Sequence, residues 1–276
     1  MKKKKKVIIL LAIFITIFVL AFDVRLQITT YTIKSSEIKG EVKLALITDL
    51  HSCDYGENQK NLLDKIAESN PDAVLLGGDI FDDILEDTNA KIVVENLAKK
   101  HKTYYVSGNH EWWSGRMDEM FGFLSSSGVN ILRGNGVNLN VGENEICIWG
   151  IDDPEVNTYD PSFPSWEKQL EKVGKEANTS KFNLLLSHRP EYAKMYLGYD
   201  FDVVLSGHAH GGQFRIPFIM NGLFAPNQGF FPEFAGGIYS FGEKQMIVSR
   251  GLSRESTRIP RIFNRPQLVF VNLVSE

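Results

Sequence analysis

The sequence predicts an α/β fold, because short apolar runs typical of buried strands alternate with segments whose apolar residues recur at helical spacing. Polar blocks follow the carboxyl ends of several of these runs, where ligands gather in open α/β sheets. The chain has 276 residues, enough for one large domain or two small ones. Beyond the first 22 residues we find no repeat and no dividing linker. We therefore expect a linker or first strand over 23–42 and one domain over 43–276.

The expected elements follow each other in a regular order along the first half of that domain. Strands are expected at 44–48, 73–76 and 103–106, with helices around 62–67, 88–97 and 117–124. Thr88 is a plausible N-cap of the second of these helices. The second half is richer in strands, which we expect at 137–141, 146–149, 182–186, 203–205, 246–248 and 268–273, with one helix at 163–177. Strands that alternate with helices predict parallel pairing.

The first 22 residues (1–22) have the composition of a membrane-targeting segment. Five lysines, Lys2 to Lys6, precede Val7 to Phe22, an apolar stretch in which only Thr16 is polar. At about 1.5 Å per residue this stretch is roughly 24 Å long, slightly short for a bilayer core of about 30 Å. An uncleaved signal anchor and a cleaved signal peptide both stay open. Because flanking lysines remain cytoplasmic, we expect the following domain outside the cell membrane, held by a single-pass transmembrane helix if the segment is retained.

Charge and cysteine content exclude two classes of protein. Without the five N-terminal lysines, the net charge of −4 becomes −9 for the rest of the chain. Such an acidic body makes nucleic acid an unlikely partner, because nucleic-acid binding needs a basic footprint. Two cysteines, Cys53 and Cys147, are too few for a disulfide scaffold.

The most informative feature is a set of five polar blocks that hold five of the six histidines. In order they are Asp49-Leu50-His51, Gly78-Asp79, Gly108-Asn109-His110-Glu111, Ser187-His188 and Gly207-His208-Ala209-His210. They combine carboxylate oxygen, amide oxygen and imidazole nitrogen, a mixture that suits two borderline divalent cations. Each block follows an apolar run, so the blocks should converge at one edge of the fold. The sixth histidine, His101, lies among lysines and is expected to be a solvated surface residue.

Taken in this order, the blocks resemble the signature of the calcineurin-like metallophosphoesterases, D-x-H, G-D, G-N-H-[DE], H and G-H-x-H. The resemblance covers about residues 43–273. It extends to Gly211-Gly212-Gln213 and Arg250-Gly251-Leu252, which are similar to a bacterial, membrane-linked subgroup that usually has glycine at the position of Ser253. The family implies a four-layer α/β/β/α sandwich, in which two mixed sheets are flanked by helices.

The resemblance also implies the site residues. One divalent cation would be held by Asp49, His51, Asp79 and His210, and a second by Asp79, Asn109, His188 and His208. The two metal ions, Mn, Fe or Zn, would lower the pKa of a shared water, and the resulting hydroxide would attack phosphorus in line. His110 is not a ligand in the pattern and would be the catalytic group that assists the leaving oxygen.

Several weaker signals remain. Trp112 and Trp113 are candidates to border the site. Six aromatic residues either form a lip for an apolar part of the substrate or pack their own loop, and both interpretations stay open: Phe214, Phe218, Phe224, Phe230, Phe231 and Phe234. Four acidic loop residues are expected to face solvent or form turns: Asp82, Asp83, Asp152 and Asp153. At most one of five arginines is expected to bind phosphate: Arg189, Arg250, Arg254, Arg258 and Arg261.

These observations predict a membrane-tethered, dinuclear metal-dependent phosphohydrolase that acts on a phosphorylated small molecule or lipid. Monoester, diester and pyrophosphate substrates are all open. One alternative is an enzyme of the same fold that faces the cell interior and cleaves the pyrophosphate of a nucleotide-linked lipid. Another is a non-catalytic phosphate-binding module, although such a module has no need of His110 and a full ligand set.

Overall fold

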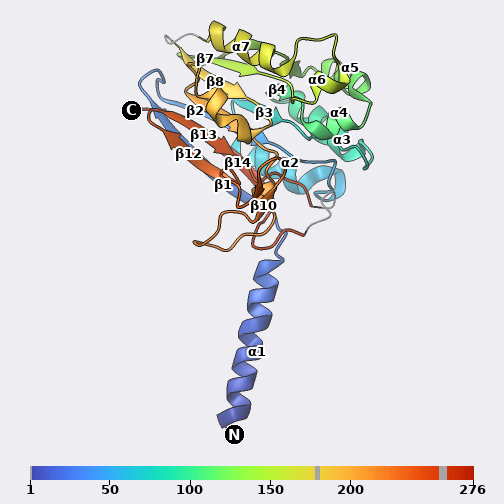
Figure 1. The fold of residues 1–276 in the computed structure, drawn as a ribbon, viewed down its shortest axis with the longest axis vertical. Helices are drawn as coiled ribbons and strands as arrows, with labels where there is room; N and C mark the ends of the chain where they lie inside the picture. The colour runs from blue at the N-terminus through green and yellow to red at the C-terminus, as the bar shows by residue number, and fades with distance from the viewer. Residues whose placement is uncertain (1, 178–180, 255–259) are drawn as a thin grey trace.

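Two six-stranded mixed sheets pack face to face between layers of helices in the computed structural model, which describes residues 2–177, 181–254 and 260–276 (Figure 1). This arrangement confirms the expected four-layer α/β/β/α sandwich. The central strands of both sheets are largely buried, as expected when each face of a sheet is covered, whereas the edge strands are partly exposed.

The first sheet has the order β1-β14-β2-β3-β4-β5. Its strands are β1 (Gln27–Ser35), β2 (Glu41–Ile47), β3 (Ala73–Gly77), β4 (Lys102–Val106), β5 (Asn130–Ile131) and β14 (Gln267–Ser275). Strands β2 to β5 run parallel, whereas β14 is antiparallel to β2 and parallel to the edge strand β1. The carboxyl ends of β2, β3 and β4 therefore meet at one edge, just before Asp49, Asp79 and Asn109.

The second sheet has the order β12-β13-β9-β8-β7-β6. Its strands are β6 (Asn135–Val141), β7 (Asn144–Gly150), β8 (Phe182–Leu186), β9 (Val203–Ser206), β12 (Gly237–Phe241) and β13 (Lys244–Val248). The four central strands are parallel, and β6 and β12 pair antiparallel at the two edges. His188 and His208 follow the carboxyl ends of β8 and β9. A separate small hairpin pairs β10 (Phe224–Ala225) with β11 (Gly229–Phe230).

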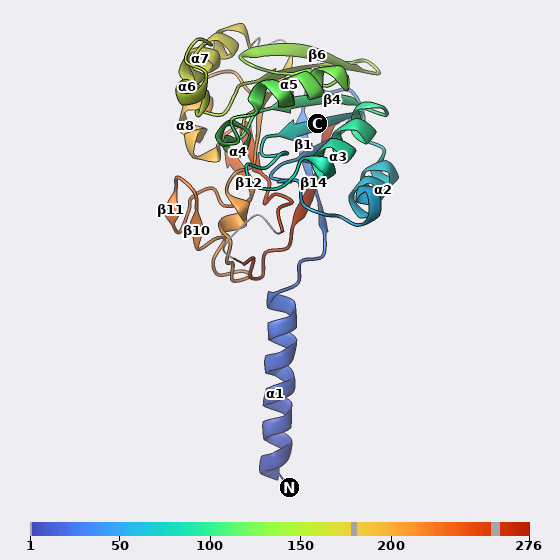
Figure 2. The ribbon, with the colours of Figure 1, turned by 90° about the vertical axis from the view of Figure 1, so that its right-hand side faces the viewer.

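Helices cover the outer face of each sheet (Figures 1 and 2). The first sheet carries α2 (Lys60–Ser69), α3 (Thr88–Ala98) and α5 (Met117–Ser126), and the second carries α7 (Trp166–Glu176) and α8 (Ala193–Tyr196). Shorter pieces are α4 (Asn109–Trp113), α6 (Val156–Tyr159) and the 3₁₀ turns η1 (Glu57–Gln59), η2 (Pro190–Tyr192) and η3 (His210–Gly212). The expected strands and helices are all present. Thr88, however, is the first residue of α3, and the preceding Asp87 uses its carboxylate to bind Arg116 instead of capping the helix.

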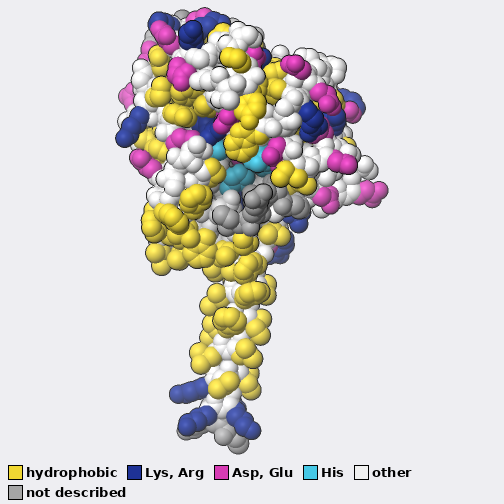
Figure 3. Space-filling view, turned by 45° about the vertical axis from the view of Figure 1, so that its right-hand side comes forward, with side chains coloured by type: hydrophobic (Ala, Val, Ile, Leu, Met, Phe, Trp, Pro, Cys, Tyr) yellow, Lys and Arg dark blue, Asp and Glu magenta, His cyan; other side chains and the backbone are white. Residues whose placement is uncertain are grey.

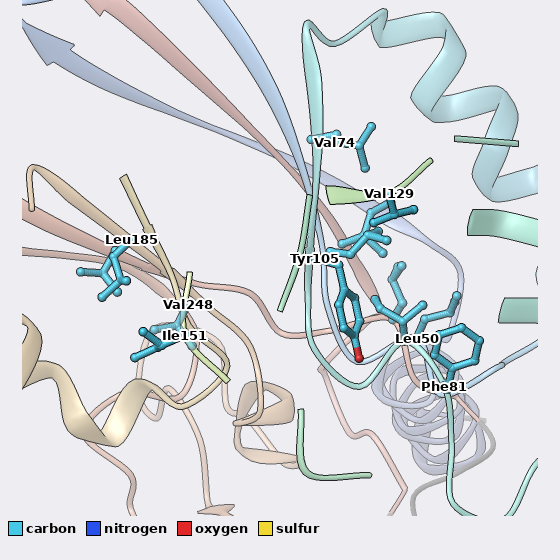
Figure 4. Packing of buried hydrophobic residues seen from close by; sticks show 14 of the residues in the cluster. Leu50, Val74, Phe81, Tyr105, Val129, Ile151, Leu185 and Val248 are labelled. Atoms are coloured by element: carbon cyan, nitrogen blue, oxygen red, sulfur yellow. The ribbon is translucent and has the colours of Figure 1, made fainter. Parts of the chain in front are cut away.

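The hydrophobic core lies in three layers because successive strand residues face opposite sides of a sheet. Leu44 of β2 and Leu184 of β8 belong to the cluster between the two sheets. The intervening residue Ala45 packs in the outer cluster, under the helices. Figure 4 shows that outer cluster in two parts, one around Val74 and the other around Leu185. The two sheets are thus held at fixed positions, which fixes the edge where their carboxyl ends meet.

Helix α1 (Lys2–Ala21) projects from the body as a separate rod (Figures 1 and 2). Its apolar side chains from Val7 to Leu20 are exposed on all sides, and only Ala21 at its end is buried. Within the three stretches of chain that the structure describes, we find no helix with both the length and the apolar character that crossing a bilayer requires. The expected single-pass transmembrane helix is therefore not found as a structural feature.

Candidate metal centre

The structure brings the seven predicted ligand residues together where the carboxyl ends of the two sheets meet. Their side chains are buried, with between 0% and 4% of each residue exposed: Asp49, His51, Asp79, Asn109, His188, His208 and His210. Histidine side chains show at the bottom of a hollow on this face of the body (Figure 3). The site is therefore a concave surface whose polar groups come from both sheets.

The charged members of the set form two groups that share one carboxylate. In the first, the ligand atoms of Asp49, His51, Asp79 and His210 all lie within 4.8 Å of one another. In the second, the same holds for Asp79, His188 and His208. Asp79 Oδ2 is 3.6 Å from His51 Nε2 and 3.1 Å from His188 Nε2. Asp79 is thus placed so that one carboxylate can serve two neighbouring cations.

Six buried ligand atoms in this site lack a hydrogen-bond partner. They are Asp49 Oδ2, His51 Nε2, Asp79 Oδ2, Asn109 Oδ1, His188 Nε2 and His208 Nδ1. A buried polar atom without a partner is unfavourable, and six in one place are not expected in a stable core. All six are oxygen or nitrogen atoms that bind divalent transition metals. The donor set therefore fits divalent metal ions.

Each of the four clustered ligand histidines has its second ring nitrogen bonded to a neighbour. The pairs are His51 Nδ1 with Asp82 Oδ2 (2.9 Å), His188 Nδ1 with the Gly77 carbonyl (2.8 Å), His210 Nδ1 with Ser253 Oγ (2.9 Å) and His208 Nε2 with Asn227 Oδ1 (2.9 Å). An acceptor at one nitrogen keeps the proton there and leaves the other nitrogen unprotonated, as metal binding requires. The site therefore directs one ring nitrogen of each histidine toward the centre. The nearby Asp79 carboxylate raises the pKa of His188 to about 10, so a cation bound there would displace a proton from this ring.

Three of these supporting residues were not assigned to the site from the sequence. Asp82 was expected to face solvent or form a turn. It accepts the backbone N–H groups of Ile84 and Leu85 in a turn, but it is 1% exposed and its other oxygen lies against His51. Ser253 stands where the subgroup usually has glycine, and its hydroxyl contacts His210. Asn227 lies in the turn between β10 and β11 and reaches His208 from there. The one available signal was Asp82, a carboxylate three residues after Asp79 at the end of a strand.

His110 lies beside the ligand groups with its ring partly exposed. Its Nδ1 is 2.6 Å from Asp83 Oδ1, and its backbone N–H donates to Asp79 Oδ1 at 2.9 Å. Burial opposes the charged form, but the Asp79 and Asp83 carboxylates raise the pKa of His110 above its usual value. The Trp113 ring is 4.9 Å from the His110 ring, so Trp113 borders the site. Trp112 is buried and donates to Ser107 Oγ.

Glu111 holds the segment that carries Asp79. Its carboxylate accepts the backbone N–H groups of Gly108 (2.8 Å), Asp79 (2.9 Å), Ile80 (2.6 Å) and Phe81 (3.2 Å). Burial and the nearby Asp79 charge raise the pKa of Glu111 to about 7. Asp79 itself has φ of 53°, a left-handed conformation that is unfavourable for a residue with a side chain. Glu111 therefore stabilises a strained segment that carries a predicted ligand, a role that the sequence did not indicate for Glu111.

Asp152 and Asp153, which were expected to face solvent or form turns, are fully buried ion-pair partners, and Asp153 also accepts the Glu155 N–H in a turn. Asp152 Oδ2 is 2.8 Å from Arg133 Nε, and Asp153 Oδ2 is 2.6 Å from Arg189 Nε. Arg189 also donates to Asn227 Oδ1 at 2.6 Å, which places a guanidinium beside His208. Burial of the ion pair fixes this cation at the rim of the metal centre.

The other candidate arginines have different environments. Arg250 and Arg261 are buried. Arg254 is exposed, and its guanidinium lies 5.5 Å from the centre of the Tyr55 ring. Arg258 lies outside the described residues. Among the four that the structure describes, Arg189 is the one with a side chain at a metal-site histidine.

The aromatic segment after the last histidine block is divided between core and surface. Phe234 is 5% exposed and belongs to the core, whereas Phe230 and Phe231 are 71% and 70% exposed. Phe224 and Phe230 face each other across the β10–β11 hairpin, with ring centres 5.4 Å apart. Because Asn227 in the same hairpin contacts His208, these exposed rings belong to a structure attached to the metal centre. Packing of the loop thus accounts for Phe234 but not for Phe230 and Phe231.

Comparison with known proteins gives a consistent family match. The family model for calcineurin-like phosphoesterases matches residues 42–212. An uncharacterised metallophosphoesterase of Campylobacter jejuni is 31% identical over 95% of this chain and 68% of its own length. A Danio rerio protein named as a transmembrane protein with a metallophosphoesterase domain is 27% identical over 78% of this chain and 49% of its own. Three other curated relatives are longer, and the chain spans 38–54% of their length.

Among solved structures, the NAD nucleotidase of Haemophilus influenzae has a similar fold. The superposition has a TM-score of 0.51 with 18% sequence identity and covers 75% of this chain and 44% of the nucleotidase. At this identity the likeness concerns the arrangement of strands and helices alone.

Proposed function

The chain belongs to the calcineurin-like phosphoesterase family and carries its metal-dependent phosphoesterase domain, and we propose that it is a dinuclear phosphohydrolase attached to a membrane. The observation that carries this proposal is the convergence of six unpartnered, buried ligand atoms on one concave site. A protein that only bound phosphate would need cationic or amide donors there, not a cluster of carboxylates and imidazoles.

The ligand assignment follows from the two groups that share Asp79. In the proposal, one cation is held by Asp49, His51, Asp79 and His210, and the other by Asp79, Asn109, His188 and His208. The distances among these ligand atoms support the division, and Asp79 bridges the pair. Mn, Fe and Zn all accept this mixture of oxygen and nitrogen ligands, so the metal is not assigned.

The chemistry follows from these residues. Two divalent cations, when bound, make water a competent nucleophile near neutral pH and neutralise charge on a phosphoryl group. His110 is free of the ligand set and partly exposed, so its Nε2 can reach a substrate oxygen. Asp83 holds the opposite nitrogen of that ring and favours its protonated form. We assign His110 as the acid that protonates the leaving oxygen and Asp83 as its positioning residue.

Helix α1 supports attachment to a membrane. An apolar helix exposed on every side is unfavourable in water, and five lysines mark one end as a charged boundary. A stretch somewhat shorter than the bilayer is accommodated by local thinning and by lysine side chains that extend to the headgroups. Some relatives are named as transmembrane proteins with the same domain. In the proposal the lysines stay on the cytoplasmic side and the catalytic domain lies outside.

The proposed substrate is a phosphate ester with an apolar portion. The exposed rings of Phe224, Phe230 and Phe231 lie on and beside a hairpin whose turn contacts His208 and Arg189. Such a surface can hold an apolar group while Arg189 and the cations hold the phosphate. Attachment to a membrane supports the same assignment, because a lipid substrate would be presented next to the site.

The test is metal-dependent hydrolysis by the full chain in detergent. The protein is stripped with a chelator, refilled separately with Mn, Fe or Zn, and assayed on aryl phosphate monoesters and diesters while bound metal is measured. We expect activity to require refilling and to saturate near two cations per chain. His101→Ala, which removes the one histidine outside the site, should behave as wild type. Full activity in stripped protein, or two bound cations with no hydrolysis of any ester or pyrophosphate, would contradict the proposal.

A further inference from the structure

A second cavity, separate from the metal centre, lies where α1 joins the body. Its volume is about 450 Å³, and its wall includes Arg215, Arg250 and Phe263. The Phe263 backbone N–H donates to the Ala21 carbonyl at the end of α1 (2.7 Å), and Arg215 N donates to the Ile262 carbonyl (3.0 Å). The cavity is therefore tied by backbone hydrogen bonds to the base of the projecting helix, and no proposed metal ligand lines it.

The two arginines of this cavity lack a counter-charge. Neither forms an ion pair with any carboxylate in the described chain, and Arg215 Nη1 is buried without a hydrogen-bond partner. Both side chains lie against Gly236, so their charges are close together. Burial, with the neighbouring Arg215 charge, lowers the pKa of Arg250 to about 10. Two adjacent cations, of which Arg250 is buried and Arg215 partly buried, are unfavourable unless an anion joins them, and guanidinium groups suit phosphate in particular.

The outer edge of the cavity is strongly apolar. Phe218 and Ile219 line it and are 109% and 82% exposed. Apolar side chains cover the end of the body around the base of the projecting helix, and the same colour continues along that helix (Figure 3). The hairpin β10–β11 lies at this end as well (Figure 2). A cationic cavity lies behind two protruding apolar side chains. The anionic headgroups and the hydrocarbon of a bilayer surface follow each other in the same order.

We propose that Arg215 and Arg250 bind the phosphate of an anionic lipid headgroup while Phe218 and Ile219 enter the acyl region beside it. This inference rests on the proposed attachment through α1, which brings the cavity to the membrane. It adds a second contact that would fix the orientation of the body. With one end of the body held flat on the bilayer, the metal centre and its aromatic hairpin would face the lipid surface at a constant distance.

The experiment uses the full chain in liposomes that contain phosphatidylcholine brominated in its acyl chains, with or without phosphatidylglycerol. Phe218→Trp reports entry of the loop, because bromine quenches a nearby indole. Tyr159→Trp is the control, since Tyr159 is an exposed aromatic residue on α6, at the other end of the body (Figure 1). Flotation of the liposomes reports attachment separately, so a failure of the proposed attachment appears as protein that does not float.

We expect stronger quenching for Phe218→Trp than for Tyr159→Trp, and a further increase with phosphatidylglycerol. In the Phe218→Trp background, Arg215→Gln with Arg250→Gln should remove that increase. Arg25→Gln should retain the increase in quenching with phosphatidylglycerol, because Arg25 near α1 already pairs with Asp23. The melting temperature should not fall in the double arginine variant, since two repelling charges are removed.

Three results would overturn the inference. The first is floating protein with equal quenching at positions 218 and 159. The second is quenching that does not change when phosphatidylglycerol is added, or an equal loss of the phosphatidylglycerol effect in Arg25→Gln and in the double arginine variant. The third is evidence that the cavity binds soluble phosphate and not a lipid headgroup. In that case inorganic phosphate raises the melting temperature of the wild type but not of the double arginine variant, and anionic lipid has no effect on quenching.

Discussion

Asp82 and Asp83 are consecutive in the chain, yet each carboxylate lies against a different histidine. Asp82 Oδ2 is 2.9 Å from His51 Nδ1, and Asp83 Oδ1 is 2.6 Å from His110 Nδ1. The rings of His51 and His110 are themselves perpendicular, with centres 4.3 Å apart. One two-residue segment therefore orients both a proposed metal ligand and the proposed acid. This arrangement couples metal binding to the position of the proton donor.

Asp83→Asn should lower kcat while leaving the metal content unchanged, because Asp83 orients His110 and not a ligand. We expect about a tenfold loss, smaller than the loss of about 10²-fold or more for His110→Ala. The loss of kcat in each variant should be larger for esters with poorer leaving groups, since a general acid accelerates those reactions most. Rates are measured for a series of phosphate esters with leaving groups of different acidity. Losses that are uniform across the series would indicate a structural role instead.

Asp79→Ala should lose both cations, because one carboxylate is shared by the two groups of ligands. His110→Ala should keep both, since His110 lies outside them. Metal content of the two purified variants, measured by elemental analysis after dialysis, separates the roles. Equal depletion in the two variants would contradict the division between ligand and acid, even if both were inactive.

The order of the strands was not predicted from the sequence, whereas the edge at which the polar blocks converge was predicted, and the reason is physical. Each polar block directly follows an apolar run, and the carboxyl ends of parallel strands share an edge. That rule places Asp49, Asp79 and Asn109 together without knowledge of the order of the strands. The match of apolar runs with β2, β3 and β4 made the inference possible.

The supporting residues could not be predicted, because their roles depend on contacts between distant segments. Ser253 is 43 residues from His210 in the chain, and Asn227 is 19 residues from His208. No local pattern links either pair. The burial of Asp152 and Asp153 was missed for the same reason, because their arginine partners lie on other segments. Sequence patterns thus predicted the proposed ligands, while the groups that orient them became visible only in the fold.

Ser253→Gly should weaken the binding of one cation and leave the fold intact. The Ser253 hydroxyl accepts from His210 Nδ1 and from Arg261, so its loss frees the ring to rotate. Loss of such an outer partner costs about 10- to 100-fold in metal affinity. When metal-free Ser253→Gly protein is titrated with Mn, one of the two binding steps should have a lower affinity than in the wild type. Ser162→Ala, an exposed serine that bonds only Asp160, is the control, and equal titrations for both would refute the role.

The catalytic domain should be digested when protease is added to protoplasts that express the full chain. The reason is that the lysines before the apolar stretch are expected to stay on the cytoplasmic side. A cytoplasmic marker protein must remain intact in the same sample. Protection of the domain until the cells are lysed would reverse the topology. That outcome would favour the alternative enzyme that cleaves a nucleotide-linked lipid inside the cell.

Removal of Phe230 and Phe231 together should impair a lipid phosphate far more than a small aryl phosphate. Both rings are largely exposed, and the hairpin that carries Phe230 contacts His208 through Asn227. Each aromatic that becomes buried against an acyl chain would contribute roughly 1.5–3 kcal/mol, about ten- to a hundredfold in affinity. The quantity to compare is kcat/KM for the two substrates, with Tyr159→Ser as the control at a distant exposed aromatic.

The melting temperature decides between a substrate surface and internal packing of the loop. Because more than two thirds of each ring is exposed, truncating Phe230 and Phe231 removes little buried area and should leave the melting temperature unchanged. If the rings instead stabilise the hairpin, Asn227 would shift away from His208 and both substrates would lose activity together. A matched loss on both substrates with a lower melting temperature would therefore remove the support for an apolar substrate, while leaving the metal-dependent hydrolysis in place.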